Sequence, residues 1–220
     1  MESLFPNRHE AGRCLAQKLK HLAPHPQLMV LALPRGGVPV AFEIARDIGV
    51  PLDVFLVRKL NVPGHEELAM GAIASGGVRV LNRDVIRSLG IPNFLIEAVT
   101  SVESRELARQ ERKYRAHLPE LNCRGNTVVL VDDGLASGAS MRVAVQALKM
   151  KGPERVIVAV PVGSSPGCEQ IQCDADEVVC ARMVEQFQSV GGYYDSFAQV
   201  SDGEVRDLLE QSSPASVSFH

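Results

Sequence analysis

Residues 127–140 read Thr-Val-Val-Leu-Val-Asp-Asp-Gly-Leu-Ala-Ser-Gly-Ala-Ser, an apolar run followed by two carboxylates and then by small residues. The β-branched and apolar residues Thr127–Val131 predict a buried strand. Residues 140–149 have a helical pattern, so a strand, a polar junction and a helix follow one another here. In an open α/β sheet, ligands bind beyond the carboxyl ends of the strands. We therefore expect a ligand at this junction.

The side chains of the junction indicate what that ligand is. Backbone N–H groups at the start of a helix, together with the hydroxyls of Ser137 and Ser140, favour a phosphate group. Asp132 and Asp133 would repel a phosphate, but they suit the hydroxyl groups of a sugar or a bound magnesium ion. The pattern therefore points to a sugar phosphate. The alternative is a strand that ends in an Asp turn, with serine capping the next helix.

A second junction of the same form lies at residues 30–39, Val-Leu-Ala-Leu-Pro-Arg-Gly-Gly-Val-Pro. The guanidinium of Arg35 can donate two parallel hydrogen bonds to one anion. Gly36 and Gly37 have no side chains, so the backbone N–H groups beside it are accessible to a ligand. This combination suits a polyphosphate. The alternative is a helix start in which the glycines serve only for close packing.

The rest of the chain alternates between helical and strand-like patterns, which predicts a parallel sheet with helices on both faces. We expect one domain over residues 1–210 and a disordered tail over 211–220, where Ser and Pro dominate. The expected elements are helices at 8–21, 38–48, 93–117 and 140–149, strands at 28–33, 53–57, 127–131, 155–160 and 177–180, a loop at 60–67, and a hairpin of 69–74 with 78–81.

Composition excludes several classes of protein. The chain has 220 residues, 45% of them hydrophobic, and a net charge of -3, so it has neither the composition of a disordered chain nor a global basic field for nucleic acid. No apolar run approaches the roughly 20 residues of a membrane span. Five cysteines and no apolar signal core favour a reducing, cytoplasmic location. With no Trp and 3 Tyr, a site built by stacking many bases is not expected.

Residues 128–140 resemble the 5-phosphoribosyl 1-pyrophosphate binding motif of the type I phosphoribosyltransferases, with Ser137 and Ser140 where threonine is commoner. Residues 30–39 resemble the pyrophosphate loop of the same family. That likeness implies a cis peptide bond between Pro34 and Arg35.

Residues 57–64, Val-Arg-Lys-Leu-Asn-Val-Pro-Gly, resemble the start of the flexible catalytic loop in the same family, which would here cover about 60–75. The whole chain is similar to stand-alone, uncharacterised bacterial proteins of this family. The resemblance implies an open, Rossmann-like parallel sheet with a core at about 27–165. It also implies a small hood, built from the N-terminal segment and about 180–205, and a homodimer.

The function implied by the resemblance is transfer of a 5-phosphoribosyl group from phosphoribosyl pyrophosphate to a nitrogen acceptor such as a nucleobase, with Mg²⁺ and release of pyrophosphate. Asp132 and Asp133 would hold the ribose hydroxyls and the metal. Arg35 and the pair Arg58 and Lys59 would neutralise the leaving pyrophosphate with Mg²⁺, and Glu66 or Glu67 is the candidate base. Where enzymes acting on 6-oxopurines carry an Asp, this chain has Ala136. The residues expected to bind substrate are Arg35, Gly36, Gly37, Arg58, Lys59, Asp132, Asp133, Gly134, Ala136, Ser137, Gly138, Ala139, Ser140 and, stacking on the acceptor, Phe187 or Tyr193.

Two other functions fit parts of the sequence. The first is a regulator that binds phosphoribosyl pyrophosphate without catalysis. The second is a hydrolase, because residues 163–167, Gly-Ser-Ser-Pro-Gly, match the nucleophile pattern G-x-S-x-G with Ser165 at its centre. Pro161 and Pro166 disturb the sharp turn that this pattern needs, and the only later histidine is His220, so the hydrolase is the weaker hypothesis.

Overall fold

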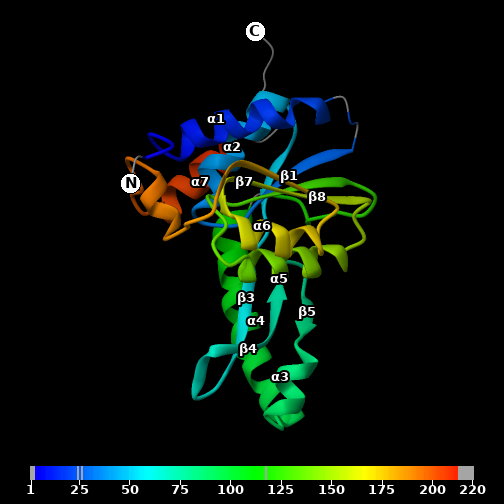
Figure 1. The fold of residues 1–220 in the computed structure, drawn as a ribbon. Coiled ribbons are helices and arrows are strands. Elements are labelled where there is room, and N and C mark those ends of the chain that lie inside the picture. The colour runs from blue at the N-terminus through cyan, green and yellow to red at the C-terminus, as the bar shows by residue number, and fades with distance from the viewer. Residues whose placement is uncertain (1–2, 24, 26, 117, 213–220) are drawn as a thin grey trace.

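The computed structural model describes residues 3–23, 25, 27–116 and 118–212. These residues form a body around a five-stranded parallel sheet, and a long arm that extends from it (Figure 1). The strand order in the body is β2-β1-β6-β7-β8. Its strands are β1 (Leu28–Ala32), β2 (Leu52–Val54), β6 (Thr127–Val131), β7 (Arg155–Ser164) and β8 (Glu177–Val184).

The central strands β1 and β6 are buried along both faces, which explains their continuous apolar runs. They pair in register from Leu28 with Thr127 to Ala32 with Val131, so both end at the same level. Each is followed directly by one of the two polar junctions. The parallel pairing therefore brings together two segments that lie about 100 residues apart in the sequence.

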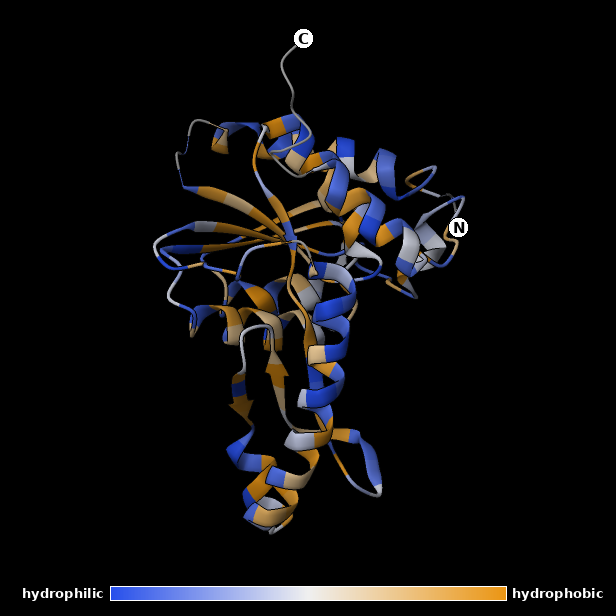
Figure 2. Ribbon diagram, turned by 180° about the vertical axis from the view of Figure 1, so that it is seen from behind, coloured by the Kyte–Doolittle hydropathy of each residue, from blue (hydrophilic) through white to orange (hydrophobic). Residues whose placement is uncertain are grey.

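Helices cover both faces of the sheet, as expected (Figure 1). One group packs with the cluster that contains Leu15, Ile44 and Val129, and the other packs with the cluster that contains Leu130, Met141 and Ile171. Figure 2 shows the hydrophobic strands enclosed between them. The first group is α1 (Arg8–Leu19), continued by the short η1 (Lys20–Leu22), with α2 (Gly37–Ile48) and α7 (Asp202–Gln211); the second is α5 (Ala139–Lys149) and α6 (Ser165–Gln172).

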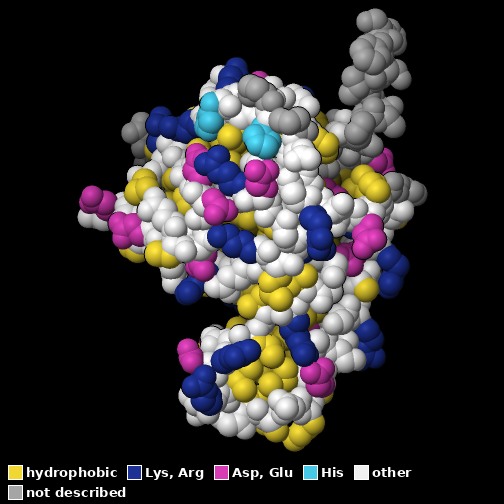
Figure 3. Space-filling view, turned by 90° about the vertical axis from the view of Figure 1, so that its right-hand side faces the viewer, with side chains coloured by type: hydrophobic (Ala, Val, Ile, Leu, Met, Phe, Trp, Pro, Cys, Tyr) yellow, Lys and Arg dark blue, Asp and Glu magenta, His cyan; other side chains and the backbone are white. Residues whose placement is uncertain are grey.

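The arm comprises residues 57–115 and carries a three-stranded antiparallel sheet of order β3-β4-β5. One face of this sheet packs on the long helix α4, and its base contacts α5. Figure 3 shows hydrophobic side chains gathered where the arm meets the body, with basic side chains around them. Its elements are β3 (Val57–Val62), β4 (His65–Ala74), β5 (Val78–Leu81), α3 (Arg83–Ser88) and α4 (Asn93–Arg115).

The arm corrects one expectation. Residues 60–67, predicted as a loop, belong to the β3–β4 hairpin, which turns at Pro63 and Gly64 with Gly64 at φ 82°. Residues 59–62 alternate between exposed and buried, but the turn at Pro63 and Gly64 and the exposed residues 65–68 end that pattern, and the pairing shifts register at Leu60/Asn61 and Asn61/Val62. The hairpin of β4 with β5 confirms the prediction for 69–74 and 78–81.

The N-terminal segment and the residues after β8, which were expected to form a hood, lie together. Phe5 pairs with Tyr194, and the backbone N–H of Asp195 donates to the carbonyl of Phe5 at 2.9 Å. The turn η2 (Val190–Tyr193) precedes this contact. Helix α7, which the sequence analysis did not predict, ends at Gln211, and the rest of the expected tail from residue 213 lies outside the described residues.

Two further observations concern membrane spans and cysteines. Within the described ranges, no helix combines the length and the apolar character that a membrane span requires. All five cysteines are free thiols.

Candidate functional site

The two polar junctions are in direct backbone contact. The N–H of Leu33 donates to the carbonyl of Val131 at 2.8 Å. A Cβ on Gly37 would lie 2.7 Å from that same carbonyl and 3.0 Å from the Cα of Asp132, so only glycine fits here. The peptide bond between Pro34 and Arg35 is cis, which confirms the prediction. The first turn of α2 therefore packs tightly against the end of β6.

Asp133 faces the hood and not the open space above the sheet. The Nε of Arg8 donates to its Oδ2 at 2.8 Å, with side-chain exposures of 11% for Arg8 and 14% for Asp133. The Arg8 guanidinium also stacks over the ring of Phe197 at 3.7 Å, and the Tyr194 hydroxyl donates to the backbone carbonyl of Asp133 at 2.6 Å. Burial raises the pKa of Asp133, and the hydrogen bond from Arg8 opposes that shift. In this structure Asp133 joins the hood to the sheet.

Asp132 lines a cavity at the carboxyl ends of β1 and β6. Burial, and then the neighbouring charge of Asp133, raise the pKa of Asp132 well above its usual range. A cation or a set of hydroxyl donors at this carboxylate would offset that cost. The two adjacent carboxylates therefore have different surroundings, although the sequence analysis gave them the same role.

The segment after Asp133 leads into α5 through a tight loop. Gly138 has φ 74°, a conformation that L side chains rarely adopt, and a Cβ there would lie 3.2 Å from the carbonyl of Gly167. The backbone N–H of Ala139 meets the Oγ of Ser137 at 3.5 Å. Ser140 stands in the first turn of α5 and lines the cavity with its hydroxyl. This is the arrangement of a helix start with small side chains that was predicted to accept a phosphate.

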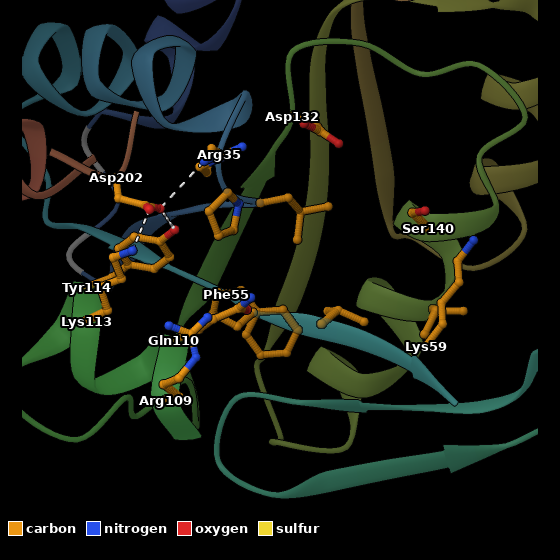
Figure 4. A pocket seen from close by; sticks show the side chains of 15 residues that line it. Arg35, Phe55, Lys59, Arg109, Gln110, Lys113, Tyr114, Asp132, Ser140 and Asp202 are labelled. Atoms are coloured by element: carbon orange, nitrogen blue, oxygen red, sulfur yellow. Dashed lines mark hydrogen bonds and ion pairs between the residues drawn. The ribbon is translucent and has the colours of Figure 1, made fainter. Parts of the chain in front are cut away.

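The cavity has a volume of about 610 Å³ and draws its walls from both junctions, β3, α4, α5 and α7 (Figure 4). Four cationic side chains line it against two carboxylates, so its field favours an anion. The cations are Arg35, Lys59, Arg109 and Lys113, and the carboxylates are Asp132 and Asp202. The other lining residues are Leu33, Pro34, Phe55, Leu56, Val57, Gln110, Tyr114, Ser140 and Val143.

Arg58 and Lys59 were expected to act as a pair, but the structure separates them. Neighbouring residues of a strand point to opposite faces. Lys59 lines the cavity, on the side where Figure 4 shows Ser140. The Nε of Arg58 instead donates to Glu103 of α4 at 2.5 Å. Only Lys59 of this pair reaches the site.

Helices α4 and α7 supply site residues that the sequence analysis missed. The carboxylate of Asp202 accepts hydrogen bonds from the Lys113 ammonium and the Tyr114 hydroxyl, and lies 3.8 Å from Arg35. These contacts, chiefly the one with Lys113, hold the pKa of Asp202 below its usual value. Burial and the Asp202 hydrogen bond raise the pKa of Tyr114 to about 12. The charged periodicity of 93–117 indicated only an exposed helix, so no local signal identified this group.

Of the site residues predicted from the sequence, Arg35, Lys59, Asp132 and Ser140 line the cavity, and Glu66 and Phe187 are among those that do not. Glu66 is exposed near the tip of the β3–β4 hairpin, and Phe187 packs on Tyr193 with ring centroids 5.1 Å apart. Neither lines the cavity. Tyr193, the other aromatic considered for the acceptor, is buried with 2% exposure and cannot stack on a ligand in this conformation. The proposed roles of Glu66 and Phe187 therefore stay predictions.

The G-x-S-x-G pattern has a structural explanation. Ser164 caps α6 by accepting from the N–H of Gly167 at 3.0 Å, and its own hydroxyl donates to the carbonyl of Ala136 at 2.5 Å. A Cβ on Gly167 would lie 2.2 Å from that carbonyl. These small residues pack α6 against the loop before α5, so the pattern gives no support to a hydrolase.

Comparison with known proteins identifies a family. The model of the family described as "Phosphoribosyl transferase domain" matches residues 5–195. A Mycobacterium tuberculosis protein, itself named only provisionally as a phosphoribosyl transferase, is 43% identical over 209 residues, covering 95% of this chain and 47% of the relative. The chain thus spans about half the length of the curated relatives that it matches.

Solved structures agree with the fold. A crystal structure from Thermus thermophilus is 40% identical and superposes with a TM-score of 0.85, covering 95% of this chain and 99% of that one. A Neisseria gonorrhoeae protein with bound ppGpp has a TM-score of 0.52 at 15% identity, covering 97% of this chain and 98% of that one. The second similarity concerns the fold alone.

Proposed function

Because the chain belongs to the phosphoribosyl transferase domain family, we propose that it transfers a 5-phosphoribosyl group from phosphoribosyl pyrophosphate to a nitrogen acceptor, with release of diphosphate. One observation carries this proposal. A single cavity joins the helix start at Ser140, the carboxylate of Asp132 and the guanidinium of Arg35. These three groups suit the phosphate, the ribose hydroxyls and the diphosphate of one molecule, in that order.

The reaction breaks the bond between the anomeric carbon and the diphosphate oxygen and forms a carbon–nitrogen bond in its place. The acceptor nitrogen loses its proton, and the diphosphate leaves with the electron pair of the broken bond. Arg35 would stabilise the leaving charge, and Asp132 would place negative charge near the developing cation of the sugar ring. Walls supplied by both the body and the arm would limit access of water, a competing acceptor, to a bound substrate.

The residues present fit a magnesium ion that is shared with the substrate. Mg²⁺ is usually bound by one or two carboxylates together with substrate phosphate oxygens. Asp132 offers one carboxylate in the cavity, and burial raises its pKa, a cost that a bound cation would offset. Asp133 could act as a second ligand of the ion only after its hydrogen bond with Arg8 breaks. When bound, the ion would neutralise part of the diphosphate charge.

Closure of the β3–β4 hairpin is required if Glu66 is to act as the base. The hairpin joins the arm to the body close to Lys59, so a hinge at its base would move its exposed tip relative to the cavity. Phe187 would likewise have to leave Tyr193 to stack on an acceptor. We keep both as proposals, together with a homodimer and a cytoplasmic location.

A direct assay tests the function. The protein is incubated with phosphoribosyl pyrophosphate, Mg²⁺ and a panel of nitrogenous bases, and diphosphate release is followed. We expect base-dependent release that falls at least 100-fold in Asp132→Asn, since both a sugar contact and a metal ligand are lost. Release that persists at the wild-type rate in this variant would show that the site is wrongly assigned.

The second candidate, a regulator that binds phosphoribosyl pyrophosphate without catalysis, rests on the arginine that occupies Asp133. If the contact between Arg8 and Asp133 persists with ligand bound, only one carboxylate serves the sugar. Binding of phosphoribosyl pyrophosphate without turnover of any base would favour this candidate over the transferase.

A further inference from the structure

One face of α4 lines the cavity with polar side chains that belong to neither junction. Arg109, Gln110, Lys113 and Tyr114 follow the spacing i, i+1, i+4, i+5, which places them on one side of a helix. The helix belongs to the arm, which packs beside the sheet and extends away from it (Figure 1). The arm therefore contributes directly to the site.

Acidic partners hold the two cations of this face in place. The Lys113 ammonium and the Tyr114 hydroxyl both bind the carboxylate of Asp202. The Arg109 guanidinium donates two hydrogen bonds to Glu106, at 2.8 and 2.7 Å. Arg35 lies 3.8 Å from Asp202, so the pyrophosphate loop and α4 share one carboxylate. A group with more negative charge than a carboxylate could bind Arg35 and Lys113 together.

The position of this face in the cavity indicates which part of the substrate it meets. Figure 4 shows Lys59 and Ser140 on one side of the cavity, and Lys113, Tyr114 and Asp202 on the other, with Arg35 near the latter group. A sugar phosphate bound at Ser140 with its ribose at Asp132 directs its diphosphate toward Arg35 and α4. Arg58 is occupied by Glu103, and Lys59 lies at the opposite side. The diphosphate end therefore lacks the pair that the sequence analysis assigned to it.

We propose that Lys113 and Arg109 of α4 bind the terminal phosphate of the diphosphate group, beside Arg35. This inference rests on the proposed function for the orientation of the substrate. The ligand class is a diphosphate, either esterified to the sugar or released as the product. Asp202 positions Lys113 and Arg35. The arm thus takes part in holding the leaving group.

Binding of two separate probes tests the proposal. Inorganic diphosphate and ribose 5-phosphate are titrated into the full chain by calorimetry in the presence of Mg²⁺. We expect Lys113→Gln and Arg109→Gln each to weaken diphosphate binding about tenfold or more, as loss of a charge-assisted hydrogen bond predicts. Ribose 5-phosphate affinity should change less than twofold. Arg112→Gln is the matched control, because Arg112 is an exposed neighbour on α4 that does not line this cavity.

A conservative variant separates binding from folding. Lys113→Arg keeps the charge and should retain diphosphate affinity within about threefold. A role limited to supporting α7 through Asp202 would instead lower the thermal midpoint of Lys113→Gln and change the diphosphate and ribose 5-phosphate affinities alike. Unchanged diphosphate affinity in Lys113→Gln and Arg109→Gln, or no diphosphate binding by the wild-type chain, would overturn the proposal. Failure of every base to react, with diphosphate binding still dependent on Lys113, would instead reject the transferase and leave the α4 site standing.

Discussion

Glycine at positions 36 and 37 allows two loops to approach more closely than any side chain permits. Gly36 has an ordinary helical φ of -61°, so its conformation does not require glycine. The surrounding atoms require glycine instead, because a Cβ at position 36 would lie 2.0 Å from the Oδ2 of Asp133. The pair of glycines was predicted to leave amides open to a polyphosphate. In the structure they also pack the Arg35 segment against residues 131–133, so that Arg35 and Asp132 line one cavity.

Replacing Gly37 with alanine should destabilise the fold. The added Cβ would collide with the backbone at Val131 and Asp132, which cannot move as a flexible side chain can. We expect the free energy of unfolding to fall by about 1–3 kcal/mol, measured by urea denaturation. Gly203→Ala in α7 is the control, because its Cβ would meet only the Ser201 hydroxyl at 3.7 Å. Equal stability of the two variants would contradict the close approach.

Asp202 gives the stability of the protein a dependence on acid pH. Its folded pKa lies below the ordinary value because Lys113, Tyr114 and Arg35 stabilise the charged form. Ionised Asp202 contributes its full stabilisation of the folded state above the pKa of an unfolded-state aspartate, about 4. This stabilisation is lost as the pH falls through the lower pKa that Asp202 has in the folded protein. Thermal midpoints between pH 7 and pH 3 should therefore decrease more in the wild type than in Asp202→Asn. Parallel curves for the two proteins would show that Asp202 contributes no such stability.

Strand β3 shows how one element divides its side chains between structure and ligand. Leu60 and Val62 are buried, and Arg58 on the same face binds Glu103 of α4. Lys59, on the other face, reaches the cavity. The Arg-Lys pair that the sequence presents as a unit therefore has two functions. The alternation of a strand makes this division obligatory once one of the two residues packs on a helix.

Variants of the two residues should separate stability from binding. Arg58→Ala should lower the free energy of unfolding by about 1 kcal/mol, because its pair with Glu103 is partly buried, and it should leave ribose 5-phosphate affinity unchanged. Lys59→Ala should leave the free energy of unfolding nearly unchanged and weaken ribose 5-phosphate binding about threefold to tenfold. Thermal unfolding and calorimetry measure the two effects. Loss of ribose 5-phosphate binding in Arg58→Ala would contradict the assignment.

At the scale of the molecule, Arg8 joins the N-terminal helix, the hood and the carboxylate pair. It binds Asp133, donates to the carbonyl of Ala198 at 2.8 Å and stacks on Phe197. These groups come from both ends of the chain and from its centre. Arg8 is far from each of them in the sequence, so these contacts exist only in the folded molecule. The hood and the candidate site are thereby coupled through one side chain.

Arg8→Ala should destabilise the protein strongly. It removes a charge-assisted hydrogen bond and leaves the buried carboxylate of Asp133 without a partner, which we expect to cost about 2–3 kcal/mol in urea denaturation. A double-mutant cycle with Asp133→Asn isolates the pair, since the asparagine does not carry the unpaired charge. A coupling energy near zero would show that the two groups contribute independently.

The buried strands, the helices α1, α2, α4 and α5 and the two polar junctions could be predicted from residue order, whereas α3, α6 and α7 were not predicted. Continuous apolar runs identify central parallel strands, and parallel strands must end at the same edge, so residues 132–140 and 34–37 were bound to meet. The β3–β4 hairpin was missed because its outer part has no buried face: Pro63 and Gly64 form the turn, and residues 65–68 of β4 are all exposed.

The partners of the site residues depended on tertiary structure. Asp132 and Asp133 are equivalent in the sequence, yet one faces the cavity and the other Arg8, since only packing decides which way adjacent carboxylates turn. The contribution of α4 and α7 was likewise invisible. A helix pattern shows which residues share a face, but it does not show what that face meets. Local periodicity thus determined the scaffold and the chemistry of its edge, while contacts between distant segments determined which side chains are available to a ligand.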